Sequence, residues 1–105
     1  MLRIHSIVID TIRITAPLAE RIGRKDRDLA SQYRRALSSV ALNIAEGSNQ
    51  RGKRRGSHYC IALGSAREAW SALLAAAAWG CIPEPDAVLA NRFDHIIGTL
   101  HRVSQ

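Results

Sequence analysis

Residues 29–44, LASQYRRALSSVALNI, decide the fold. Large apolar side chains recur here at steps of four, four, three and four, which is the spacing of one face of an α-helix. These positions are Leu29, Tyr33, Leu37, Val40 and Ile44. Asp26 is placed to cap the start of this helix, and Gly47 to end it in a left-handed conformation. The stretch therefore predicts an amphipathic helix bounded by a cap at each end.

Two more helices follow from the same spacing. In residues 57–79, alanines and leucines recur at alternating steps of four and three, with Ser57 as the predicted cap and Gly80 as the predicted end. The sequence CIPEPD then breaks the chain. Residues 85–103 return to the helical spacing, and Pro85 is placed in the first turn, where proline is tolerated.

The N-terminal segment is ambiguous, because IVIDTIRIT at 7–15 is rich in β-branched residues and resembles a strand. A single strand beside three helices would have no partner, so we predict a helix with a bend or irregularity at Pro17. Its apolar positions also fit helical steps: Ile4, Ile7, Thr11, Ile14, Leu18 and Ile22. Residues 1–105 are thus predicted to form one all-α domain, an antiparallel up-down-up-down four-helix bundle.

Positive charge is concentrated in one part of the chain. The formal net charge is +6, and residues 21–55 hold ten of the fifteen Lys and Arg against three acidic residues. Such asymmetry suits a polyanionic partner, although a solvated basic surface without a ligand explains it equally well.

The composition also predicts where the protein resides. No stretch of eighteen apolar residues is present and the N-terminus lacks the pattern of a signal peptide, so we expect a cytoplasmic protein without a membrane partner. Cys60 and Cys81 form no CxxC motif, and we expect two reduced, buried thiols rather than a disulfide.

Patterns of catalytic or metal-binding residues are missing from the sequence. It contains no Walker loop, no G-x-S-x-G and no Glu-x-x-His pair, and His58 and Cys60 splay apart if they lie on a helix. We therefore predict a protein that is not an enzyme and that holds no metal and no cofactor.

A basic loop follows the helix at 29–44. Two glycines, Gly52 and Gly56, predict that this loop is flexible and able to follow a phosphate backbone. The predicted nucleic-acid contacts are Arg51, Lys53, Arg54 and Arg55. Binding of this kind is strong at low salt and carries little sequence information. The competing interpretation is a solvated loop with no ligand.

Glu46 lies in the last turn of its helix, where the helix dipole disfavours a carboxylate. A compensating partner is therefore expected, either Arg51 or the free amide groups near Ser57, with Asn43 joining the same polar network. A role for Glu46 as a catalytic acid or base lacks a second carboxylate or histidine at a suitable spacing.

Further positions on this helix and the next are predicted to serve structure. Arg34 and Arg35 are expected in the same structural network, with Glu68 as a partner, or at a contact between subunits. Leu42 faces away from the apolar stripe and is the predicted oligomer contact. Trp70 and Trp79 are expected as core or interface anchors rather than as platforms for stacked bases. Glycine and serine at 64–65 are expected to let helices approach closely.

Three elements of the sequence carry a resemblance to a known family. They are Arg34-Arg35-Ala36, Asn43-Ile44-Ala45-Glu46-Gly47 and Ile61-Ala62-Leu63-Gly64-Ser65. The chain resembles, over nearly its whole length, the four-helix-bundle proteins first noticed as reading frames inside intervening sequences of bacterial large-subunit ribosomal RNA genes. Two departures stand out: the Phe-Pro pair of the family near the first helix junction is replaced by Ile22-Gly23, and His58 takes the place of a family aromatic.

The resemblance implies an antiparallel bundle that assembles as a ring-like homopentamer. It also implies kinship with the basic accessory proteins of diversity-generating retroelements, which bind a reverse transcriptase and nucleic acid. We therefore predict a non-enzymatic oligomeric scaffold that binds RNA or DNA through the basic loop. The alternatives are a scaffold for proteins alone and an accessory subunit of a reverse transcriptase.

Overall fold

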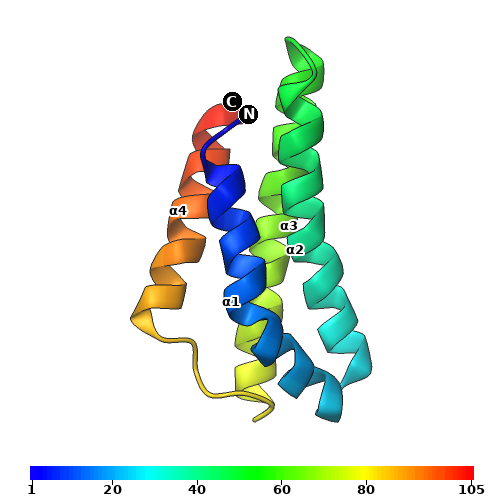
Figure 1. The fold of residues 1–105 in the computed structure, drawn as a ribbon, viewed down its shortest axis with the longest axis vertical. Coiled ribbons are helices and arrows are strands. Elements are labelled where there is room, and N and C mark those ends of the chain that lie inside the picture. Colours follow the sequence, from blue (N-terminus) through cyan, green and yellow to red (C-terminus); the bar gives the residue numbers. More distant parts are fainter.

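The computed structural model describes residues 1–105 and contains four α-helices and no β-strand. The helices are α1 (Ile4–Lys25), α2 (Arg27–Ser48), α3 (Lys53–Ala78) and α4 (Ala87–Val103). They lie side by side in a rod with extents of 43 × 25 × 19 Å (Figure 1). The all-α prediction with four helices is confirmed, and so is the choice of a helix over a strand at the N-terminus.

The helix α1 is continuous despite its β-branched residues and an internal Pro17. Two threonines lie on its buried face, and each hydroxyl donates to a carbonyl four residues earlier: Thr11 Oγ1 to Ile7 O at 2.7 Å and Thr15 Oγ1 to Thr11 O at 2.8 Å. These bonds satisfy polar groups that burial would otherwise leave unpaired. The C-terminal half of α1 leans toward α2 (Figure 1).

A single residue, Asp26, separates α1 from α2. Its carboxylate Oδ1 accepts a hydrogen bond from the amide of Leu29 at 2.9 Å, which confirms the predicted cap. Ile22 and Gly23, where the sequence departs from the Phe-Pro pair, both lie within α1, so the helix is unbroken there. Ile22 is buried, and a Cβ on Gly23 would meet only Ala30 Cβ at 3.5 Å.

The prediction that Gly47 ends α2 in a left-handed conformation is wrong. The helix continues to Ser48, and positive φ angles occur only at Gly52 and Gly80. Gly47 is required for another reason. A Cβ at this position would lie 2.6 Å from Cε1 of the Tyr59 ring, so the missing side chain lets α2 and α3 come together.

Of the two predicted boundaries of α3, the start is wrong and the end is confirmed. Ser57 does not cap the helix, because Gly52, with φ of 59°, turns the chain and α3 begins at Lys53. The predicted end at Gly80 is confirmed. Gly80 has a φ of 80°. Its amide donates to the Ala77 carbonyl at 3.0 Å, and the Cys81 amide donates to the Ala76 carbonyl at 2.8 Å. These two hydrogen bonds form a Schellman motif.

The last helix begins two residues later than predicted. Asp86 caps α4 through a hydrogen bond from the Leu89 amide to its Oδ1 at 2.9 Å, so Pro85 lies before the cap rather than in the first turn. In the assembled fold α1 packs on α2, α2 on α3, α3 on α4, and α4 back on α1.

One hydrophobic core runs along the rod, and Trp70 joins it through a tilted contact with Phe93, with ring centroids 5.1 Å apart. Two expectations about side chains near this core are wrong: Gly64 faces open space, and Cys60 is exposed, whereas Cys81 is buried; both thiols are free. Trp79 is 81% exposed, so it is not a core anchor, and its alternative role at an interface stays a prediction. Burial of these residues depends on which way each helix faces, and that is set by packing.

Candidate nucleic-acid interface

The connection between α2 and α3 is short. The sequence predicted a flexible basic loop at 51–55, but the connection spans 49–52, and Lys53, Arg54 and Arg55 form the first turn of α3. Only Arg51 of the predicted contact residues lies outside a helix. The four side chains are therefore presented on a defined helix end; we call Arg51, Lys53, Arg54 and Arg55 the α3 basic end.

The positive charge of the α3 basic end is not neutralised within the chain. The only salt bridge joins Arg13 Nη1 to Asp10 Oδ1 at 3.0 Å, and the first turn of α3 contains no acidic residue. The N-terminus of a helix carries the positive end of its dipole, so cations placed there add to the positive potential instead of being stabilised by it. Such a helix end attracts anions.

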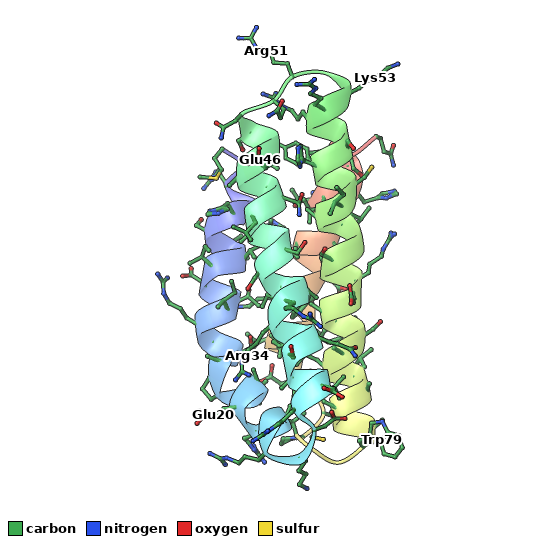
Figure 2. All side chains as sticks on the ribbon, turned by 90° about the vertical axis from the view of Figure 1, so that its right-hand side faces the viewer. Glu20, Arg34, Glu46, Arg51, Lys53 and Trp79 are labelled. Atoms are coloured by element: carbon green, nitrogen blue, oxygen red, sulfur yellow. The ribbon has the colours of Figure 1, made fainter.

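Arg55 differs from the other three cations. Its Nε donates to the carbonyl of Gln50 at 3.0 Å and, more weakly, to that of Gly47 at 3.4 Å. The Gly47 carbonyl belongs to the last turn of α2, and Gln50 lies in the connection that follows. Arg55 therefore holds the turn, while Arg51, Lys53 and Arg54 make no hydrogen bond or ion pair in the chain. Figure 2 shows Arg51 and Lys53 pointing away from the rod at its tip.

Glu46 has no hydrogen-bond or ion-pair partner in the chain, and its side chain is exposed. The pairing that the sequence suggested, with Arg51 or with the amides near Ser57, is therefore not formed. Arg34 and Arg35 are also exposed and unpaired, and neither contacts Glu68 in an ion pair. Of the predicted polar network, only Asn43 is engaged.

Asn43 lies at the centre of a polar seam between α2 and α3. Its Nδ2 donates to the Ser39 carbonyl at 3.0 Å, and its Oδ1 is 3.1 Å from Nδ1 of His58. Because Oδ1 only accepts, His58 must carry its proton on Nδ1. Ser39 Oγ in turn lies 2.9 Å from Ser65 Oγ. Sequence reasoning missed this seam, although the spacing of Ser39 and Asn43 places them one above the other on the helix.

The other basic segment lies at the opposite end of the rod. Arg24, Lys25 and Arg27 surround the junction of α1 and α2, which is far from the α2–α3 connection along the long axis (Figure 1). Lys25 Nζ also donates to the Gly80 carbonyl at 3.2 Å, across the same end. These charges do not extend the α3 basic end.

Other kinds of site receive no support from the side chains. No group of three or more His, Cys, Asp or Glu is placed to hold a metal ion. Burial raises the pKa of Tyr33 to about 12, although a hydrogen bond from its hydroxyl to Thr15 Oγ1 at 2.7 Å acts in the other direction. None of the helices combines the length and apolar character needed to cross a membrane.

A protein-family model described as 23S rRNA-intervening sequence protein matches residues 3–102, a range that includes almost all of the four helices. The chain belongs to this family. The resemblance that we noted from three short elements is thereby confirmed. Searches of curated proteins and of solved structures gave no match.

The three elements that carry the family resemblance lie on the two helices that form the seam. Arg34-Arg35-Ala36 and the Asn43–Gly47 element belong to α2, and Ile61–Ser65 belongs to α3. Within them, Asn43, Gly47 and Ser65 make the interhelical contacts described above. The 23S rRNA-intervening sequence family name states no activity.

Proposed function

We propose that this protein is a non-enzymatic, homo-oligomeric scaffold that binds RNA or DNA through the α3 basic end. The helices are taken to run up-down-up-down in an antiparallel bundle, and the assembly to be the homopentamer that the family resemblance implies. The observation that supports nucleic-acid binding is the unneutralised positive charge at the tip of the α2–α3 pair. Phosphate groups are the ligands that such a surface attracts.

The α3 basic end suits a phosphate backbone better than it suits bases. Lysine and arginine side chains on a helix N-terminus contact phosphate oxygens, together with the free backbone amides of the first turn. No aromatic side chain belongs to the α3 basic end, so stacking of bases adds little there. We therefore expect weak sequence preference and a strong dependence on salt. Several copies of the α3 basic end in one assembly strengthen binding through avidity.

The test is binding of mixed-sequence single- and double-stranded RNA and DNA, followed by fluorescence anisotropy at low and moderate salt. The variant combines Arg51→Gln, Lys53→Gln and Arg54→Gln, and it retains Arg55 because that side chain holds the turn. We expect weaker binding, and a plot of log K against log salt that flattens by roughly 0.7 to 0.9 for each phosphate that the variant no longer neutralises.

A matched control removes the same number of charges elsewhere. Arg24→Gln, Arg27→Gln and Arg67→Gln are exposed positions away from the tip, and this triple variant is expected to bind nearly as the wild type does. Equal losses in the two variants would show that net charge alone matters. A wild-type protein that binds neither RNA nor DNA at low salt would replace the proposal with the protein-only scaffold, for which a reverse transcriptase is one partner to test.

A further inference from the structure

The outer face of α2 carries an apolar side chain between unpaired charges. Leu42 is 68% exposed and lies within α2. One turn later on the same face is Glu46, and two turns earlier is Arg35; both are exposed and neither is paired in the chain. A single exposed leucine is ordinary by itself, but the unpaired charges of both signs on the same face offer complementary contacts to another protein surface.

A hollow lies on a different side of the rod, between the start of α1 and α4. It has a volume of about 630 Å³, and its lining includes Leu2 and Ile7 from the N-terminal segment and His95 and Thr99 from α4. The side chain of Arg3 lines the same hollow and makes no ion pair. The hollow thus combines apolar side chains from α1 and its start with polar ones and one free cation.

The register between α1 and α2 places these two features at the same height. The Tyr33–Thr15 hydrogen bond joins the two helices and gives their approximate register. In the antiparallel arrangement, Leu42 is nine residues beyond Tyr33 and Ile7 is eight residues before Thr15. Counted from this bond, the two positions lie within a few residues of the same height, at about 1.5 Å for each residue. In a ring whose axis is parallel to the rod, rotation from one copy to the next does not change the height of any residue. Leu42 of one copy and the hollow of the next therefore lie at similar heights.

Charges agree with the same register. Glu46 is thirteen residues beyond Tyr33, and Arg3 is twelve residues before Thr15, so the two charges lie at similar heights. Near the other end of the rod, the exposed Asp28 of α2 is level with the exposed Arg21 of α1, again within one residue. Opposite charges therefore face each other on both sides of the Leu42–Ile7 level. Between them, Arg35 is level with the Asp10–Arg13 ion pair, whose carboxylate can accept from both arginines.

We propose that α2 of one copy packs against α1 and α4 of the next, with Leu42 in the hollow and Glu46 beside Arg3 of the neighbouring copy. This inference rests on the homo-oligomer proposed above and names the faces that form it. The two faces are different surfaces of the chain, so the contact is heterologous and can close into a ring. A pentamer, having an odd number of subunits, needs contacts of this kind.

Charge exchange provides the first test, with mass in solution as the measurement. Glu46→Arg and Arg3→Glu each place like charges together and are expected to weaken assembly by roughly tenfold or more, whereas the double variant restores it. Glu68→Arg is the matched control, because Glu68 is an exposed, unpaired carboxylate on α3, outside both faces. It is expected to assemble as the wild type does.

Cross-linking provides the second test and reports the orientation of copies. In a background with Cys60→Ser and Cys81→Ala, one protein carries Leu42→Cys and another Ser6→Cys, a position that also lines the hollow. A short bismaleimide is expected to join the two proteins only when they are mixed. Leu42→Cys that links efficiently to itself would indicate a two-fold contact and overturn the proposal.

The outcomes separate this inference from the proposed function. A wild-type protein that assembles, but shows neither rescue by the double exchange nor a mixed cross-link, overturns the assigned faces and leaves the oligomeric scaffold intact. A wild-type protein that stays monomeric at all concentrations overturns the oligomer and the faces together. Nucleic-acid binding is measured separately, through the α3 basic end.

Discussion

Gly47 on α2 faces the ring of Tyr59 on α3 so closely that a Cβ on Gly47 would lie 2.6 Å from Cε1 and 2.9 Å from Cδ1 of that ring. Tyr59 is only 4% exposed, so the ring has little room to move away. The pair belongs to the region where the Asn43–His58 contact also joins the two helices. A glycine in the last turn of α2 is thus explained by a contact with another helix.

Replacement of Gly47 by alanine is expected to destabilise the protein. Overpacking of a core costs typically 1–3 kcal/mol, which exceeds the gain of about 1 kcal/mol from the better helix propensity of alanine. The control is Gly98→Ala on α4, where the new Cβ would meet only the Arg102 guanidinium at 3.6 Å, and a small gain is expected. The measurement is the free energy of unfolding of both variants in chemical denaturant. Equal changes in the two variants would contradict the close contact between Gly47 and Tyr59.

The hydroxyl of Tyr33 makes stability depend on pH at the alkaline end. Its pKa rises from 10.0 to about 12 on folding, so the folded chain holds the phenolic proton more tightly than the unfolded chain does. Stability is therefore unaffected by this group below pH 10 and falls between pH 10 and 12, by roughly 3 kcal/mol in total. Tyr33→Phe removes this dependence, as well as a hydrogen bond worth about 1 kcal/mol at neutral pH.

The measurement is unfolding of the wild type and of Tyr33→Phe between pH 8 and pH 12, with the difference between them as the readout. The wild type should be the more stable protein at neutral pH and should lose that advantage above pH 10. Tyr59→Phe is a control for the other tyrosine. Parallel curves for wild type and Tyr33→Phe would show that Tyr33 does not titrate as its burial implies.

The two aspartate caps are expected to contribute independently. Asp26→Ala and Asp86→Ala each remove an acceptor for a backbone amide at a helix start, at a cost of about 1 kcal/mol each. Asp94→Ala is the control, because Asp94 is exposed within α4 and makes no hydrogen bond. Thermal unfolding reports all three, and a loss at Asp94 equal to the losses at the caps would contradict the assignment.

The two tryptophans should differ in their access to solvent. Trp79 is 81% exposed, whereas Trp70 is half-buried against Phe93. In Trp70→Phe the remaining fluorescence should be quenched readily by acrylamide and emit at long wavelength; in Trp79→Phe it should be protected and shifted to the blue. Protection of Trp79 in the assembled protein would show that another chain covers the end of α3, away from the faces proposed above.

Much of the fold was accessible from the sequence, because the signals are local. Helical spacing predicted all four helices, and it correctly favoured a helix over a strand at 7–15. Asp26 and Gly80 were identified as boundaries because a cap bonds to amides or carbonyls within a few residues. The start of α3 was misplaced, because a serine cap and a glycine turn compete in the same short segment, and the turn at Gly52 wins.

The sequence by itself determined the helices, the outward direction of Leu42 and the excess of positive charge, since each follows from neighbours along one chain segment. The tertiary structure decided what Gly47 is for, that Asn43 rather than Glu46 joins the helices, and that the α3 basic end stays unpaired. These features depend on distances between residues on different helices, and such distances exist only once the helices have packed.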